Sequence, residues 1–139
     1  MTAIIKASIL KKLQKLEQVI RMLEMEKATP LEEFLENTEK QFAVMHALVL
    51  GIEVVTDVGN YLLANEFNKS ADTYEKIIGS LKNVGVISTE LFENSKGMTG
   101  FRNLLIHVYE DVEPERVFEY LQKAPEQFRQ YARSFQKYL

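Results

Sequence analysis

Four side chains suited to acid–base chemistry and anion binding lie within eight residues of one another. Arg102 and Asn103 are followed by His107 and Tyr109. Histidine exchanges a proton near neutral pH and can act as a general acid or base. Arginine stays charged, and its planar guanidinium binds the oxygens of phosphate. Together these residues suit proton transfer beside a group on which negative charge develops.

The segment that carries these side chains has the pattern of an amphipathic helix. Apolar residues recur at the i, i+3, i+4, i+7 spacing that predicts one buried side. These residues are Phe101, Leu104, Leu105 and Val108. The apolar Ile106 lies away from that side, among the polar residues, so we expect a partly covered groove or a subunit interface there.

The spacing of Arg102 and His107 bears on how one site could contain both. In a continuous helix, two residues five positions apart diverge by about 140° around the axis. The long Arg102 side chain could bridge part of that angle. Alternatively, a two-fold dimer could bring two such helices together, so that both chains contribute to a shared cleft.

This pattern resembles the R-x4-H-x-Y motif of the HepT-like HEPN ribonuclease toxins. Arg102, His107 and Tyr109 stand at its spacing, and a Gly-Phe pair precedes them at positions 100–101, as in that family. The segments DVGN at 57–60, GVI at 85–87 and EPERV at 113–117 add to the resemblance, which extends over nearly the whole chain.

The resemblance implies a metal-independent endoribonuclease that needs no cofactor and works as a homodimer. Arg102 and His107 would be the catalytic pair, with Asn103 orienting His107 or donating to the phosphate. His107 would help the 2′-hydroxyl of RNA attack the adjacent phosphate, while Arg102 stabilises the charge that builds there. The products would carry a cyclic phosphate, and the RNA could be tRNA or mRNA.

The resemblance also implies a regulatory partner, an MNT-type nucleotidyltransferase antitoxin that transfers AMP to Tyr109. The added AMP would place negative charge and bulk beside Arg102. An alternative is a non-catalytic HEPN subunit that binds a nucleotidyltransferase as a regulatory or substrate-binding module. The acidic pair Glu110 and Asp111 beside the motif keeps this alternative open.

Length and composition indicate one globular domain over residues 1–139. Hydrophobic residues make up 46% of the chain and charged residues 27%, which is typical of a folded domain. The absence of cysteine fits a cytoplasmic protein, and we expect neither a signal peptide nor a membrane span. With a net charge of −3, RNA would have to bind through a local basic patch.

The apolar periodicity and the scarcity of glycine and proline predict an all-α fold, an up-and-down bundle of four or five helices. We expect helices over residues 4–27, 31–66, 71–83, 89–109 and 116–138. Thr29 and Ser70 are expected to cap the second and third helices, and Ser88 the fourth. Pro125 should kink or interrupt the last one.

The second helix is apolar on most sides, yet one stripe of it is polar. The stripe consists of His46, Glu53, Asp57 and Asn60. We expect these side chains to meet one another, another polar surface or water, because an unpaired buried polar group costs about 1–3 kcal/mol. Asp57 and Asn60 are candidate supporting residues of the site. His46 and Glu53 are too few for a metal site and favour a structural pair.

Overall fold

A computed structural model describes residues 1–107 and 112–139. Over these residues the chain forms seven helices and no strand, which confirms the predicted all-α fold. The helices are α1 (Ala3–Lys27), α2 (Leu31–Glu36), α3 (Thr38–Glu66), α4 (Tyr74–Asn83), α5 (Thr89–Asn94), α6 (Met98–Ile106) and α7 (Pro114–Gln136).

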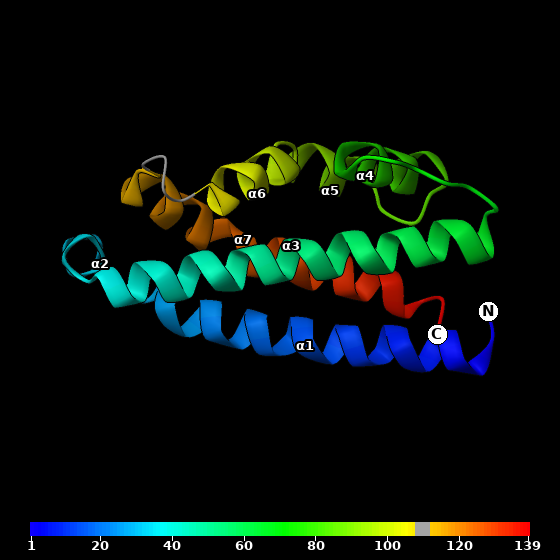
Figure 1. The fold of residues 1–139 in the computed structure, drawn as a ribbon, viewed down its shortest axis with the longest axis horizontal. Coiled ribbons are helices and arrows are strands. Elements are labelled where there is room, and N and C mark those ends of the chain that lie inside the picture. The colour runs from blue at the N-terminus through cyan, green and yellow to red at the C-terminus, as the bar shows by residue number, and fades with distance from the viewer. Residues whose placement is uncertain (108–111) are drawn as a thin grey trace.

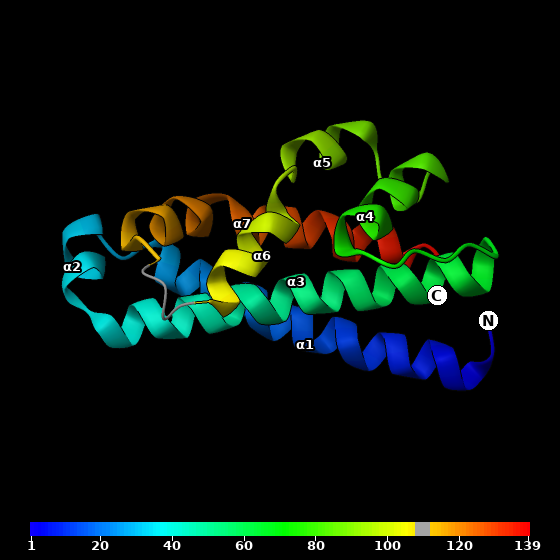
Figure 2. The same cartoon turned by 45° about the horizontal axis from the view of Figure 1, so that its top comes forward.

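Three long helices, α1, α3 and α7, lie side by side and form the body of the bundle (Figure 1). The chain runs along α1, turns through α2, returns along α3 and comes back through the short helices α4, α5 and α6 before α7 (Figures 1 and 2). The short helices therefore cover one side of α3, and both α4 and α6 contact it. This is the predicted up-and-down arrangement.

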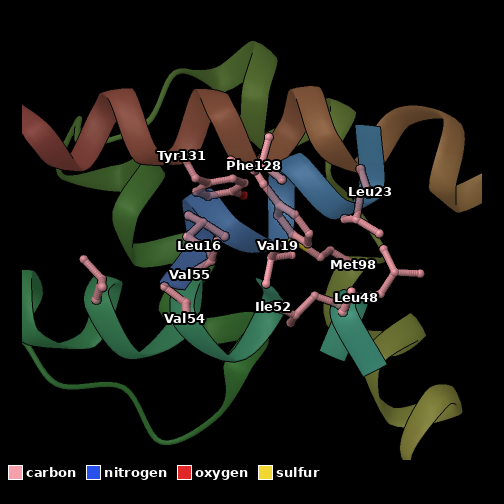
Figure 3. Packing of buried hydrophobic residues seen from close by; sticks show 14 of the residues in the cluster. Leu16, Val19, Leu23, Leu48, Ile52, Val54, Val55, Met98, Phe128 and Tyr131 are labelled. Atoms are coloured by element: carbon pink, nitrogen blue, oxygen red, sulfur yellow. The ribbon is translucent and has the colours of Figure 1, made fainter. Parts of the chain in front are cut away.

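The core lies where α1, α3 and α7 meet (Figure 3). Leu16 and Leu23 of α1 pack there with Leu48 and Ile52 of α3 and with Phe128 of α7, and all five side chains are fully buried. Residues three, four or seven apart on each helix provide this buried face, as expected for amphipathic helices. The core fixes α3 from one side and leaves its other side to α4 and α6.

The predicted helix over residues 31–66 is two helices, because the chain breaks at Asn37. Asn37 has φ −115° and ψ 94°, and its side-chain oxygen accepts a hydrogen bond from the backbone N–H of Lys40 at 3.0 Å. Asparagine is among the best N-cap residues, so it ends α2 and begins α3 in one step. The apolar pattern on both sides of Asn37 concealed this break.

Two of the predicted caps are wrong, and one is confirmed. Pro30 precedes α2 without a side-chain cap, while the Thr29 hydroxyl donates to Glu26 at 3.4 Å. Helix α4 begins three residues later than expected, and its cap is Thr73 rather than Ser70. Ser88 does cap α5, by accepting from the backbone N–H of Leu91 at 3.0 Å.

The predicted helix over residues 89–109 is divided into α5 and α6. Gly97 has φ +87°, a left-handed conformation that glycine adopts without strain, and it precedes α6. Helix α6 ends at Ile106, with His107 as its C-cap at φ −101° and ψ 42°. The rest of the predicted helix, residues 108–109, lies outside the described residues.

Pro125 was expected to kink or interrupt the last helix, and it does not interrupt it. Helix α7 runs from Pro114 to Gln136 with the buried Pro125 inside it. Pro114 stands at the first turn, where its missing N–H has no intrahelical partner to lose, and Glu115 follows in the same turn.

Helix α3 is long and apolar enough to span a membrane by length and composition alone. Its most apolar window has a mean hydropathy of 1.6, and 61% of that window is buried within the protein. The structure accounts for this apolarity, because α1 and α7 pack on one side of α3 while α4 and α6 pack on the other. The apolar surface is therefore that of a central core helix.

Candidate active site on helices α3, α4 and α6

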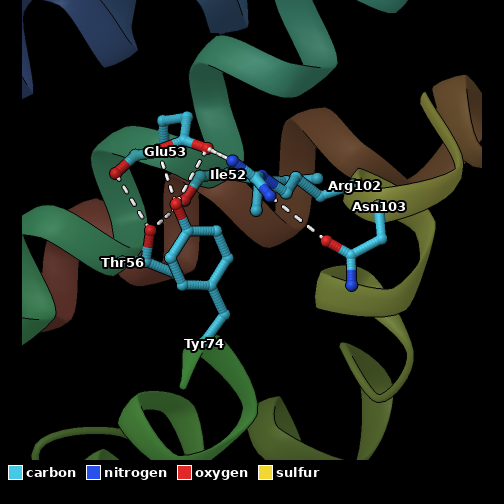
Figure 4. Close-up of polar contacts among 6 residues, drawn as sticks. All are labelled: Ile52, Glu53, Thr56, Tyr74, Arg102 and Asn103. Carbon is cyan, nitrogen blue, oxygen red and sulfur yellow. Dashed lines mark hydrogen bonds and ion pairs between the residues drawn. The ribbon is translucent and has the colours of Figure 1, made fainter. Parts of the chain in front are cut away.

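The Arg102 guanidinium of α6 is held by the Glu53 carboxylate of α3 (Figure 4). Nε donates to Glu53 Oε1 at 2.7 Å, and Nη2 lies 2.6 Å from the same oxygen. The two side chains are 20% and 31% exposed, so the pair is partly shielded but remains open to a ligand. The arginine thus presents one whole edge to a single carboxylate oxygen.

Two more side chains complete the surroundings of this guanidinium. The Tyr74 ring of α4 lies under it, with Arg102 Cζ 4.5 Å from the ring centroid. The Tyr74 hydroxyl donates to Glu53, at 3.0 Å from Oε2 and 3.1 Å from Oε1. On the remaining side, Arg102 Nη1 donates to Asn103 Oδ1 at 3.2 Å. Three helices therefore meet at one cation.

The electrostatics of this cluster keep the Tyr74 hydroxyl protonated. Burial raises the pKa of Tyr74 above its ordinary value, and the hydrogen bond to the negatively charged Glu53 raises the pKa further. Tyr74 therefore stays a hydrogen-bond donor to Glu53 through the physiological pH range.

His107 lies at the exposed end of α6, five residues after Arg102. Its backbone N–H donates to the Leu104 carbonyl at 3.3 Å, which closes the last turn. His107 has φ −101° and ψ 42°, so the chain leaves the helix after this residue.

An apolar cleft lies between α3 and the end of α6, beside His107. It has a volume of about 390 Å³ and is lined by Phe42, Met45, His46, Val49, Leu105 and Ile106. The side chains of Phe42 and Ile106 are 61% and 43% exposed. Ile106 thus lies at a groove on the non-core side of α6, where the sequence led us to expect one.

The residues of the polar stripe of α3 have different partners. Glu53 meets Arg102 and Tyr74, so the predicted pairing of Glu53 with His46 is wrong. Asp57 is exposed and lies 3.5 Å from Lys12 of α1, and Asn60 is also exposed. Among the described contacts neither reaches Arg102, so a supporting role for them stays a prediction.

Sequence reasoning missed Glu53 and Tyr74 as parts of the site. Glu53 was one of four residues in the polar stripe, and nothing in the sequence set it apart from the other three. The sequence of α3 does not show which of them faces α6. Tyr74 had no signal, since its place depends on where α4 begins and how α4 packs on α3. Tyr109 lies outside the described residues.

The described residues contain no group of three or more His, Asp or Glu side chains that could hold a metal ion. Helix α6 carries a fixed cation and the amide of Asn103, and the exposed His107 is its C-cap. This set can bind an anionic group and exchange a proton near it.

Comparison with known proteins identifies the family of this chain. The sequence profile of the family described as "Ribonuclease HepT-like" matches residues 9–135. A protein named tRNA nuclease HepT from Aphanizomenon flos-aquae is 28% identical over 110 residues, which are 78% of this chain and 74% of that protein.

Two solved structures share the fold. One contains a tri-AMPylated Shewanella oneidensis HEPN toxin in complex with MNT antitoxin, with 20% identity, 99% of each chain covered and a TM-score of 0.83. The other is the cytosolic protein YutE from Bacillus subtilis, of unknown function, with 18% identity, 96% of this chain and 90% of that chain covered, and a TM-score of 0.80. With the family match over residues 9–135, they show that this chain is a HEPN-fold protein of the HepT-like ribonuclease family.

Proposed function

We propose that this protein is the toxin of a toxin–antitoxin pair and cuts RNA with Arg102 and His107 as its catalytic residues. The observation that carries the proposal is the Arg102 guanidinium, fixed on three sides at an accessible surface, on the helix whose C-cap is His107. The name of the tRNA nuclease relative supports RNA as the substrate class.

In the proposed reaction His107 accepts the proton of a ribose 2′-hydroxyl as that oxygen attacks the neighbouring phosphorus. The bond from phosphorus to the 5′-oxygen of the next nucleotide breaks, and that oxygen takes up a proton from water. Arg102 stabilises the negative charge that develops on the phosphate oxygens. The products are a 2′,3′-cyclic phosphate and a 5′-hydroxyl, and the step needs no metal ion.

Cleavage of a tRNA pool and of an mRNA in the presence of EDTA tests the proposal. We expect the wild type to produce cyclic phosphate ends, and His107→Ala and Arg102→Ala each to lower the rate by about 100-fold or more. Activity of His107→Ala equal to that of the wild type would refute the catalytic assignment. No cleavage of any RNA, combined with tight binding of a nucleotidyltransferase, would favour the non-catalytic module instead.

The proposed active form is a homodimer in the cytoplasm, with the apolar cleft at the dimer interface. Phe42 and Ile106 expose apolar surface next to His107, and such patches commonly mark contacts between proteins. Burying them against a second copy would place two His107 residues near one shared groove. Light scattering should show a dimer for the wild type and a monomer for Phe42→Glu combined with Ile106→Glu. A monomeric wild type at micromolar concentration would refute this part.

The proposed control is AMP transfer to Tyr109 by an MNT-type nucleotidyltransferase antitoxin. It is supported by the structural neighbour, which is an AMPylated HEPN toxin bound to its MNT antitoxin. The mass of the peptide containing Tyr109 should rise by one or more AMP units with the transferase and ATP, and not in Tyr109→Phe. An unchanged mass with the transferase still bound would point to inhibition by occlusion.

A further inference from the structure

The Arg102 guanidinium is restrained on one edge, on one face and at Nη1. Glu53 occupies its Nε and Nη2 edge, the Tyr74 ring covers one face, and Asn103 takes a donor from Nη1 (Figure 4). Each terminal nitrogen carries two N–H groups. Contacts with the described residues therefore still leave donors on Nη1 and Nη2 for a phosphate.

The carboxylate of Glu53 is itself restrained, which makes it a rigid support. The Tyr74 hydroxyl donates to both of its oxygens, at 3.1 and 3.0 Å. Directly behind it on α3, the Thr56 hydroxyl lies 2.9 Å from the Ile52 carbonyl and 3.1 Å from the Glu53 carbonyl. Tyr74 acts on Arg102 twice, through its ring and through Glu53.

Placing a carboxylate on the arginine has a cost for substrate binding. It cancels one positive charge where an anionic substrate would bind, so it opposes ground-state affinity. Glu53 of α3 and Tyr74 of α4 nevertheless both contact Arg102. Such contacts fit a need to orient the guanidinium more than a need to bind the substrate tightly. A rate depends on alignment in the transition state, where an error of 1 Å can cost about 100-fold.

We infer that Glu53 and Tyr74 are positioning residues, which hold the Arg102 guanidinium in the orientation that meets the phosphate in the transition state. This inference rests on the proposed ribonuclease function. Glu53 of the polar stripe of α3 and Tyr74 at the start of α4 thereby take part in catalysis, although neither belongs to the R-x4-H-x-Y motif.

Three substitutions separate orientation from charge and from folding. Glu53→Ala removes the support, Glu53→Gln keeps an acceptor of the same shape without the charge, and Tyr74→Phe keeps the ring but loses the hydroxyl. The matched control is Glu24→Gln, which alters another interhelical pair, the 3.0 Å contact between Glu24 of α1 and Arg129 of α7. Thermal unfolding of each variant shows that the fold is retained.

Steady-state cleavage should then show a split between kcat and KM. We expect Glu53→Ala to lower kcat by about 10- to 100-fold, with KM unchanged or lower because a negative charge has gone. Glu53→Gln should recover most of kcat, Tyr74→Phe should lower it by only a few fold, and Glu24→Gln should match the wild type. Wild-type kcat in Glu53→Ala, or a higher KM with kcat unchanged, would overturn the inference.

A second measurement reads the position of Arg102 without any reaction. In the NMR spectrum the Arg102 Nε–H signal, assigned by its loss in Arg102→Lys, should exchange slowly with water in the wild type and quickly in Glu53→Ala. Fast exchange in the wild type would overturn the inference even if RNA is cut. Slow exchange without any RNA cleavage would instead refute the proposed function, and with it the catalytic role assigned to Glu53 and Tyr74.

Discussion

Gly51 is the position at which one added methyl group should test the packing of the bundle most sharply. A Cβ atom there would lie 2.3 Å from Cε2 and 2.6 Å from Cζ of Phe128, whose side chain is fully buried. Carbon atoms in contact lie about 3.5–4.0 Å apart, so α3 and α7 would have to separate by about 1 Å or the ring would have to move.

Two opposing effects determine how much Gly51→Ala changes the free energy of unfolding. Overpacking a close-packed core costs about 1–3 kcal/mol. Replacing glycine by alanine inside a helix contributes about 1 kcal/mol in the other direction. The free energy of unfolding should therefore fall by up to about 2 kcal/mol. Gly79→Ala in α4 is the matched control, because nothing lies within 4 Å of its Cβ. The free energy of unfolding of Gly79→Ala should rise by about 0.5–1 kcal/mol.

Urea denaturation gives the free energy of unfolding of both variants, which we expect to be higher for Gly79→Ala by about 0.5–3 kcal/mol. Combining Gly51→Ala with Phe128→Leu should cost less than the sum of the two single changes, because the shorter side chain makes room. RNA cleavage by Gly51→Ala should also slow, since Glu53 lies two residues further along α3. Equal stability of the two glycine variants would refute the close contact between α3 and α7.

Three further predictions concern caps, buried hydroxyls and pH. Asn37→Ala should lower the free energy of unfolding by about 1 kcal/mol through loss of the α3 cap, and Asn37→Ser should restore it. Ser95→Ala should cost about 1–3 kcal/mol, because the buried Tyr131 hydroxyl loses its 2.7 Å partner, and adding Tyr131→Phe should cost little more. Burial raises the pKa of Tyr131 to about 12, against about 10 in the unfolded chain. The unfolded chain therefore loses this proton first, and the Tyr131 contribution to stability should be lost between about pH 10 and 12. The melting temperature of Tyr131→Phe should fall less steeply over that range, and equal slopes would contradict the assignment.

The helical periodicity of apolar residues determined the fold class. Burying one stripe of each amphipathic segment requires helices packed on helices, and the near-continuous apolar surface of residues 42–64 could only be the central element. A Cβ added at Gly59 would lie 2.7 Å from Leu81 Cδ1, so this position of α3 is closely packed. The more severe contact at Gly51 carried no signal, because it depends on Phe128 of a distant helix.

Helix ends were the weaker part of the sequence prediction. Several residues between 28 and 38, and again between 70 and 74, have side chains that can cap a helix. Which of them does so depends on where the chain must turn to pack. In the structure Asn37 caps α3 and Thr73 caps α4. Local preference proposes several such residues, and tertiary packing selects among them.

The sequence by itself placed Arg102, Asn103 and His107 on one helical segment. These residues are close together in the chain, and the apolar residues around them recur at helical spacing. Only the tertiary structure decided what holds Arg102. Its partners Glu53 and Tyr74 are 49 and 28 residues away along the chain and come from two other helices, so no local pattern links them. Their meeting depends on the depth at which α4 and α6 sit on α3, which is set by side-chain packing across the whole bundle.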